Sequence, residues 1–360
     1  MSYEVDFLPI GKGACGDSFA LRFGDLESGD PAKQTVVLID GGFTDDADLI
    51  KQHFDDWYGH NKIDLVISTH PDQDHINGLS GVLQKMDVTE LWMHLPWEHS
   101  EVLSESKHAG FNTARLNQKL AKALQSSADL ATVASQTVSV VREPFAGETS
   151  LVTGHGRVTV VGPSRDYYEA LLPQFLDWQP KAKAQLTAFE RLTRGLQKAA
   201  ESFNIETLRD RGETSPQNNS SAIVLVEYDG KKLLFTGDAG REAIDLACEE
   251  LEYLGHQPGS YTVVQVPHHG SRHNVGPTIL DRLLGSKLPN DSTSRGFAYA
   301  SAAKDCEDHP KKVVLNAFKR RGYPVISTEG ISRLIHSGGP DRGWGPSVPH
   351  PLYAEVEDDD

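Results

Sequence analysis

A short segment that follows an apolar run sets the strongest limit on the fold of this chain. Residues 64–67 read Asp-Leu-Val-Ile, which predicts a buried strand. The next eight residues are Ser68-Thr69-His70-Pro71-Asp72-Gln73-Asp74-His75, with two imidazoles and two carboxylates in six consecutive positions. Nitrogen and oxygen ligands gathered at the end of a rigid strand are typical of a divalent-metal site. The segment therefore predicts a scaffold of strands and helices that presents a metal centre at a strand end.

A simpler interpretation of this segment is a polar turn, because a lone His-X-Asp often does no more than solvate a loop. In an extended loop, however, side chains alternate, so His70, Asp72 and Asp74 face the same way, and His75 follows at a helix start. Two carboxylates held this close repel each other unless a cation offsets their charge. We therefore interpret the segment as a metal site.

The overall composition is that of an ordinary globular protein. The chain has 360 residues, 38% hydrophobic and 24% charged, enough for one large domain or two smaller ones. No window approaches twenty apolar residues and the N-terminus lacks a secretion signal, so we expect a cytoplasmic protein without membrane insertion. The three cysteines, Cys15, Cys248 and Cys306, are odd in number and far apart in sequence, which predicts reduced thiols.

The net charge of -16 limits the partners that the chain can bind. Phosphate contacts dominate nucleic-acid affinity, so this charge argues against tight, non-specific binding of duplex. The negative net charge does not exclude a nuclease, because metal ions and a local basic strip can recruit phosphate. Part of the negative charge lies in residues 346–360, an acidic tail that we expect to be disordered.

Apolar patterning predicts alternating strands and helices. Strands are expected at residues 5–10, 18–23, 35–40, 63–68, 90–94, 137–141, 151–161, 222–228, 232–235, 262–266, 297–300 and 325–327. Helices are expected at residues 46–57, 76–86, 112–133, 241–254 and 311–321, and one or two long amphipathic helices at residues 166–208. Asp229-Gly230 predicts a type I′ hairpin turn. The long helical stretch between strand-rich parts indicates an insertion at about residues 165–215, which we interpret as a solvated cap.

Further ligand candidates stand at strand ends in the second half of the chain. Asp238 comes shortly after the apolar run at residues 233–235, and His268-His269 follow the run at residues 263–266. Each alone is also typical of a helix cap or a surface turn. Together with the segment at residues 70–75 they indicate ligands that converge on one edge of a sheet sandwich.

These motifs carry a family resemblance. They are Leu38-Ile39-Asp40-Gly41-Gly42, Ser68 to Leu79, Asn218-Asn219-Ser220-Ser221, Leu234-Phe235-Thr236-Gly237-Asp238, Val266-Pro267-His268-His269-Gly270-Ser271, and His309-Pro310 with Ser327-Thr328-Glu329-Gly330. The chain resembles the metallo-β-lactamase superfamily, and more closely the hydrolase domain of ComEC-type DNA-uptake proteins and their stand-alone relatives. The resemblance runs over about residues 3–336, except for the region 165–215. It implies a four-layer αβ/βα sandwich of the α/β (α+β) class with a helical insertion, in one domain over residues 1–345.

The resemblance also implies a set of metal ligands. His70 and Asp72 would belong to one metal position, Asp74 and His75 to the second, Asp238 would bridge, and His268 or His269 would complete the second position. Asp72 stands where the superfamily usually has its second histidine, and residues 217–220 replace the usual histidine of the third motif. The first position is therefore expected to be poor in nitrogen. Carboxylate and amide oxygens in place of imidazole favour harder cations than Zn²⁺ alone, and we expect one or two ions of Zn²⁺ or Mn²⁺.

Other residues are assigned roles around these ligands. Asp72 or Asp74 would orient or deprotonate the attacking water. His269, Ser271 and His309 would contact substrate, protonate a leaving group or support the ligands, and Asp40 and Asn219 are expected in the same surroundings. The turn at residues 11–17 lacks the ending of a phosphate loop, and the resemblance places it beside the site.

The leading functional hypothesis is a metal-dependent hydrolase, a phosphodiesterase or nuclease that acts on nucleic acid through a metal-activated water. Two alternatives stay open. One is a hydrolase of a small ester, thioester or phosphoester, because the fold hosts many chemistries. The other is a non-catalytic regulatory component that binds a metal or nucleotide within a larger assembly of protein partners.

Overall fold

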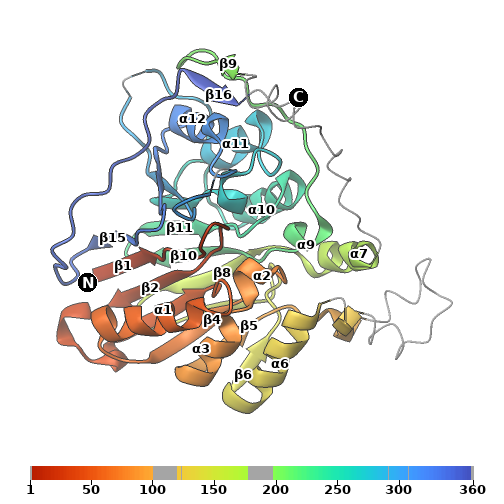
Figure 1. Ribbon diagram of the computed structural model, residues 1–360, viewed down its shortest axis with the longest axis vertical. Coiled ribbons are helices and arrows are strands. Elements are labelled where there is room, and N and C mark those ends of the chain that lie inside the picture. Colours follow the sequence, from red (N-terminus) through yellow and green to blue (C-terminus); the bar gives the residue numbers. More distant parts are fainter. Residues whose placement is uncertain are drawn as a thin grey trace.

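Two seven-stranded sheets form the centre of the molecule (Figure 1). The computed structural model describes residues 2–99, 120–122, 124–176, 198–290, 292–306 and 308–357. The first sheet has the spatial order β15 (Arg333–Ser337), β1 (Ser2–Phe7), β2 (Phe19–Gly24), β3 (Gln34–Ile39), β4 (Lys62–Ile67), β5 (Asp87–Trp92) and β6 (Val140–Arg142). The second has the order β14 (Val325–Ser327), β13 (Phe297–Ala300), β12 (Val263–Gln265), β11 (Lys231–Phe235), β10 (Ile223–Tyr228), β8 (Arg157–Gly162) and β7 (Ser150–Val152).

Each sheet has an antiparallel part and a parallel part. Strands β15, β1, β2 and β3 pair antiparallel, and β3 to β6 pair parallel. In the second sheet β7, β8, β10 and β11 pair antiparallel, and β11 to β14 pair parallel. Neighbouring parallel strands end at the same edge of a sheet, so residues that follow β3 and β4, or β11 and β12, come close together.

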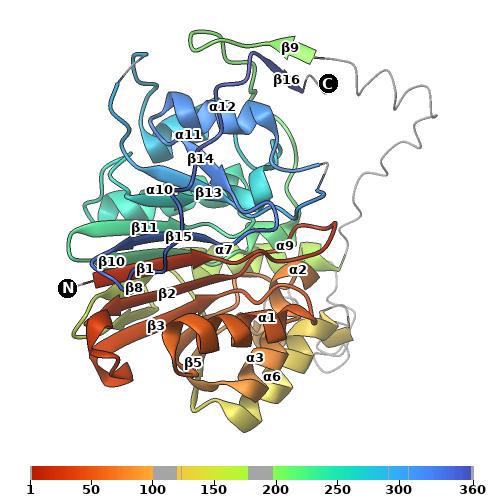
Figure 2. The same ribbon diagram turned by 60° about the vertical axis from the view of Figure 1, so that its left-hand side comes forward.

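Helices cover the outer face of each sheet, which gives four layers (Figure 2). The first sheet carries α1 (Asp46–His53), α3 (Leu79–Lys85) and α6 (Gln125–Thr137), and the second carries α10 (Arg241–Tyr253), α11 (Pro277–Leu284) and α12 (Lys312–Arg320). Shorter helices are α2 (Gln73–Ile76), α7 (Arg165–Phe175) and α9 (Pro216–Asn219), with single turns at Leu26–Ser28, Pro31–Lys33, Phe54–Tyr58, Pro96–His99 and Pro267–Gly270. The predicted four-layer αβ/βα sandwich is confirmed.

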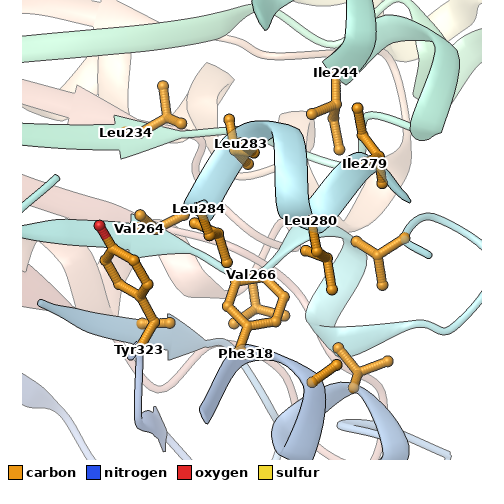
Figure 3. Close-up of a cluster of buried hydrophobic side chains, with 14 of the residues drawn as sticks. Leu234, Ile244, Val264, Val266, Ile279, Leu280, Leu283, Leu284, Phe318 and Tyr323 are labelled. Carbon is orange, nitrogen blue, oxygen red and sulfur yellow. The ribbon is translucent and has the colours of Figure 1, made fainter. Parts of the chain in front are cut away.

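Apolar side chains fill the space between the layers. Between the sheets, the ring of Phe7 stacks on that of Tyr299 with centroids 4.0 Å apart. On the other face of the second sheet, Leu234 and Val264 pack toward Leu283 of α11 (Figure 3). Both faces of the central strands are therefore buried, which explains their nearly continuous apolar sequences.

Several predicted elements differ from the structure in detail. Residues 151–161 form the hairpin β7–β8 with its turn at Thr153 to Gly156, a segment whose sequence is itself typical of a hairpin tip. The Asp229-Gly230 turn has positive φ at both residues, 46° and 72°, as a type I′ turn requires. Within the part of the chain that the structure describes, no helix is both long and apolar enough to cross a membrane.

The predicted helix at residues 166–208 is wrong over part of its length. Helix α7 ends at Phe175, residues 177–197 lie outside the described residues, and the chain continues as a short strand, β9 (Lys198–Ala200). Residues 112–119 of the predicted helix at 112–133 lie outside the described residues, and α6 covers its later part and ends at Thr137.

Part of the acidic tail forms regular structure in the described residues. Glu355–Glu357 form β16, which pairs antiparallel with β9. The single apolar residue of this strand, Val356, is 2% exposed and belongs to the core cluster of the second sheet. Burial of one side chain therefore anchors an otherwise acidic strand, and residues 358–360 lie outside the described residues.

Candidate metal centre

Four strand ends bring the candidate ligands together. Asp40 follows β3 and His70 follows β4 in the first sheet, while Asp238 follows β11 and His268 follows β12 in the second. These are the parallel strands of the two sheets, so their carboxyl ends meet at one edge of the sandwich.

The centre of this edge is a group of three buried residues. The ligand atoms of His70, His75 and Asp238 lie within 4.8 Å of one another, and each residue is at most 2% exposed. Nε2 of both histidines and Oδ1 of Asp238 have no hydrogen-bond partner. Buried polar atoms without partners are rare, and three that point at one another are explained by a cation between them.

The two oxygens of Asp238 face different histidines. Oδ2 lies 3.8 Å from His70 Nε2 and 3.5 Å from His268 Nε2. Oδ1 lies 3.4 Å from His75 Nε2. The geometry therefore divides the centre into two positions that share this carboxylate.

The remaining acidic residues of the 70–75 segment separate in the same way. Asp72 Oδ2 is 3.7 Å from His70 Nε2, on the side of the first position. Asp74 Oδ2 is 3.8 Å from His75 Nε2 and 3.3 Å from His269 Nε2, on the side of the second. Asp74, His75 and His269 themselves form a group that could hold an ion.

His268 and His269 face opposite positions because of an unusual backbone. Both have positive φ, 49° and 54°, a left-handed conformation that non-glycine residues rarely adopt. Two such residues in sequence turn consecutive side chains toward different partners, and backbone strain of this kind clusters at functional sites. The sequence suggested that one of the two completes the second position and that the first is poor in nitrogen. In the structure His268 Nε2 lies 3.5 Å from Asp238 Oδ2 and His269 Nε2 lies 3.3 Å from Asp74 Oδ2, and which of the two ligates an ion stays a prediction.

One buried carboxylate orients two of the histidines. Asp40 Oδ2 lies 2.8 Å from His75 Nδ1 and accepts a hydrogen bond from Thr69 Oγ1 at 2.7 Å. Because the Thr69 hydroxyl gives its proton to Asp40, it can accept one from His70 Nδ1, 3.0 Å away. Both histidines then carry their proton on Nδ1 and keep the Nε2 lone pair for a metal.

The other two histidines have comparable supports. His268 Nδ1 lies 3.0 Å from Asn274 Oδ1 and 3.1 Å from Asn218 Nδ2. His269 Nδ1 makes an ion-pair contact of 3.3 Å with Asp17 Oδ1, and the second oxygen of Asp17 accepts a hydrogen bond from Gln265. All four rings therefore turn Nδ1 to a polar partner and Nε2 to a carboxylate of the centre.

The carboxylates control the protonation of these rings. Burial would lower the pKa of His75 and His269, but Asp238 and Asp74 beside His75, and Asp17 beside His269, raise both well above the usual value. Burial would likewise raise the pKa of Asp238, but the neighbouring histidines, His268 first, hold it well below its usual range. The centre thus favours positive charge, which protons or metal ions can supply.

Three other predicted residues lie outside this ligand set. Ser271 Oγ accepts a hydrogen bond from the His273 amide, and Asn219 Oδ1 accepts one from the Gly240 amide. The neighbour Asn218, rather than Asn219, reaches the centre, where its Nδ2 donates to Asp238 at 3.4 Å. The His309 ring lies 5.9 Å from that of His268, and burial together with the nearby histidines lowers the pKa of His309 to about 4.

Sequence reasoning missed the supporting residues Gln265 and Asn274, and it gave no supporting role to Asp17 and Thr69, although it placed their segments at the site. One signal was available for Gln265, which is a lone polar residue in the apolar run at residues 263–266. Its Oε1 accepts hydrogen bonds from the amides of Thr236 and Gly237, and its Nε2 donates to Asp17. A buried polar residue in an apolar strand usually has such a structural reason.

A cavity of about 660 Å³ opens beside the centre. Its lining comes from three segments: Pro71, Asp72, Gln73 and Asp74; Lys122, Leu124, Gln125 and Ser126; and Ser215 and Gln217. This volume is in the range of small-molecule sites, so a substrate part as large as a nucleotide has room there.

Comparisons with known proteins give one family match and several similar solved structures. Residues 32–145 match the family model described as the metallo-beta-lactamase superfamily. Similar solved structures include the metallo-beta-lactamase fold protein YhfI from Bacillus subtilis (TM-score 0.42, 9% identity, 94% of this chain and 100% of that chain). Another is a diphosphatase from the PhnP family (TM-score 0.41, 12% identity, 92% of this chain and 97% of that chain). A third is Zn²⁺-bound PqqB from Methylobacterium extorquens (TM-score 0.41, 12% identity, 92% of this chain and 99% of that chain). Comparison with curated proteins gives no match. The family match and the four layers support the metallo-β-lactamase superfamily fold.

Proposed function

We propose that this chain is a metal-dependent phosphodiesterase that hydrolyses nucleic acid at the centre around Asp238. The arrangement of the four histidines carries the proposal. Each turns Nδ1 to a polar partner and Nε2 toward Asp238 or Asp74, and the Nε2 atoms of His70 and His75 have no hydrogen-bond partner. Metal-ligating histidines have this arrangement in proteins.

The donor set favours two ions. The first position would be held by His70, Asp72, His268 and Asp238, and the second by Asp74, His75, His269 and Asp238. Each set combines two imidazole nitrogens with two carboxylate oxygens, a mixture that suits Zn²⁺ or Mn²⁺. When bound, the ions supply Lewis-acid chemistry, which activates water and offsets charge on the phosphoryl oxygens.

Asp72 is the best-placed proton acceptor in this proposal. Its side chain is 41% exposed and lines the cavity, whereas that of Asp238 is 2% exposed. A carboxylate that holds an ion through one oxygen keeps the other free for the proton of the attacking water. Both ring nitrogens of His269 face carboxylates, so we assign it to the ligands rather than to proton transfer.

Nucleic acid is proposed as substrate because of the motifs typical of the ComEC-like branch and because the cavity is open and polar. The net charge of -16 favours single strands and short substrates, since long-range attraction to duplex is weak at this charge. The protein is proposed to act in the cytoplasm.

The test is metal analysis together with cleavage assays. Purified protein is loaded separately with Mn²⁺, Mg²⁺ or Zn²⁺ and mixed with single-stranded DNA, duplex DNA, RNA or bis(p-nitrophenyl) phosphate. We expect cleavage of single strands that Asp238→Ala abolishes and that Asp48→Ala, a change of an exposed carboxylate, leaves intact.

Two results contradict the proposal. Loaded protein that cleaves none of the four substrates is not a phosphodiesterase. Cleavage of bis(p-nitrophenyl) phosphate alone removes nucleic acid from the proposal and favours a small phosphoester instead.

A further inference from the structure

The cavity beside the metal centre contains one cation among its described lining residues. Lys122 is exposed and lines this cavity together with Asp72 and Asp74. Among the described residues, no carboxylate forms an ion pair with Lys122, whereas Lys85, for example, pairs with Asp48. The described lining therefore presents the positive charge of Lys122 to an anion that enters the cavity.

Polar groups on the same walls leave hydrogen-bonding capacity open. Gln217 Oε1 is buried without a partner, although its Nε2 donates to the carbonyl of Phe175 at 3.4 Å. Ser126, which lines the same cavity, is half-buried. The lining thus offers one full positive charge and several neutral groups, a combination suited to a single phosphate attached to a larger polar group.

We infer that Lys122 binds a phosphate group of the substrate other than the one that is hydrolysed. The inference rests on the proposed function, because it assigns the reacting phosphate to the metal ions. The carboxylates Asp72 and Asp74 would be neutralised by those ions, and Lys122 would then supply the charge for the neighbouring phosphate. The substrate class is a short or single-stranded phosphodiester with a second phosphate next to the scissile one.

The number of cations limits the length of strand that is recognised here. Each phosphate neutralised on a single strand contributes about -0.7 to the slope of log affinity against log salt concentration. One lysine therefore accounts for about one such contact. A protein that follows a long strand would need several, and the described part of this cavity offers no second cation.

The experiment measures binding of two nucleotide probes to the Mn²⁺-loaded protein by calorimetry. Thymidine 3′,5′-bisphosphate carries a second phosphate and thymidine 5′-monophosphate does not. The variants are Lys122→Ala, Lys122→Arg and the control Lys231→Ala, which changes an exposed lysine at the start of β11, away from the ligand end of that strand.

We expect Lys122→Ala to weaken bisphosphate binding about tenfold, to change monophosphate binding less than twofold, and to reduce the salt slope by about 0.7. Lys122→Arg restores the affinity, and Lys231→Ala binds like the unchanged protein. Equal affinities of Lys122→Ala and unchanged protein for the bisphosphate overturn the inference. Equal weakening with both probes also overturns it, because Lys122 would then contact the phosphate at the ions.

Hydrolysis of a thymidine dinucleotide is measured in parallel and separates the two proposals. If Lys122→Ala selectively loses affinity for the bisphosphate but the unchanged protein does not hydrolyse the dinucleotide, the phosphodiesterase activity is refuted and the phosphate site is supported. Turnover that Lys122→Ala leaves unchanged, with unchanged bisphosphate affinity, supports the activity and refutes the phosphate site.

Discussion

Asp40 accepts a hydrogen bond from His75 Nδ1 at 2.8 Å, and the same carboxylate oxygen accepts one from Thr69 Oγ1 at 2.7 Å. Asp40 is fully buried and has a positive φ of 58°, so the turn after β3 holds its side chain beside the 70–75 segment. Through Thr69 it also orients His70. One residue that touches no proposed ion therefore sets the direction of two ligands.

Replacement of Asp40 should weaken metal binding without removal of a ligand. In Asp40→Asn, one acceptor oxygen becomes a donor, which opposes either the Thr69 amide at Oδ1 or both the Nδ1 proton of His75 and the Thr69 hydroxyl at Oδ2. Loss of such a partner typically lowers metal affinity 10- to 100-fold, and we expect a change in this range. A competition titration with a chromogenic chelator measures it, with Asp48→Asn as the control. An affinity equal to that of the control variant would refute the orienting role.

The separation of His268 from His269 predicts the metal content of single variants. His268→Ala should lose the ion at the first position and His269→Ala the ion at the second, so each keeps about one ion per chain. Asp238→Ala removes the shared carboxylate and should lose both. Elemental analysis after dialysis gives the stoichiometry. If both histidine variants lack the same ion, the two positions assigned here are incorrect.

A buried ion-pair network predicts how stability depends on pH. Burial would raise the pKa of Asp6, but hydrogen bonds and charge from His53 and Arg342 outweigh it and lower that pKa below its usual value. The group therefore stabilises the fold above about pH 4, where the unfolded chain also ionises, and loses this contribution as pH falls through the lower folded value. Asp6→Asn should lower the free energy of unfolding by about 3–5 kcal/mol at pH 7, because Arg342 and His53 lose a buried partner.

Urea denaturation at pH 7 and pH 3 measures this effect. The difference between Asp6→Asn and the unchanged protein should shrink at pH 3, and Asp25→Asn, which changes an exposed carboxylate, should show little effect at either pH. A difference that grows in acid would contradict the assigned direction of the shift.

The C-terminal strand should contribute to stability despite its acidic sequence. Val356 is 2% exposed, and truncation to alanine removes two methyl groups from a packed core. We expect Val356→Ala to lower the free energy of unfolding by about 2 kcal/mol, measured by urea denaturation. Val348→Ala, at an 81% exposed position, is the matched control. Equal stability of the two variants would show that β16 is not docked in solution.

The sequence predicted most strands to within a few residues because apolar runs of strand length mark buried parallel strands directly. The convergence of Asp238 and the His268–His269 pair on the 70–75 segment also followed from the sequence, since each stands shortly after such a run. The division of the pair was not predictable. It depends on two consecutive left-handed residues, a conformation that is uncommon for any non-glycine residue, although histidine is among those that adopt it more often.

Asp17 and Val356 were missed because their roles depend on contacts between distant segments. Gly16 packs so closely on the Asp74 carbonyl that a Cβ would lie 2.7 Å from its oxygen, and this contact brings Asp17 to His269. No local pattern encodes that approach. The acidic residues around Val356 predicted a solvated segment. One apolar side chain among them was too weak a signal to predict that this strand packs on the core.

The shared carboxylate Asp238 has a consequence that is mechanical rather than chemical. It belongs to the second sheet, whereas His70 and His75 belong to the first, so any ion between them ties the two halves of the sandwich together. An ion that binds the folded chain and not the unfolded one stabilises the fold according to its concentration and affinity, so the two halves would be held together more firmly only in the loaded state. The edge of the molecule where the proposed substrate would bind is thus also the edge where bound ions would connect the two sheets.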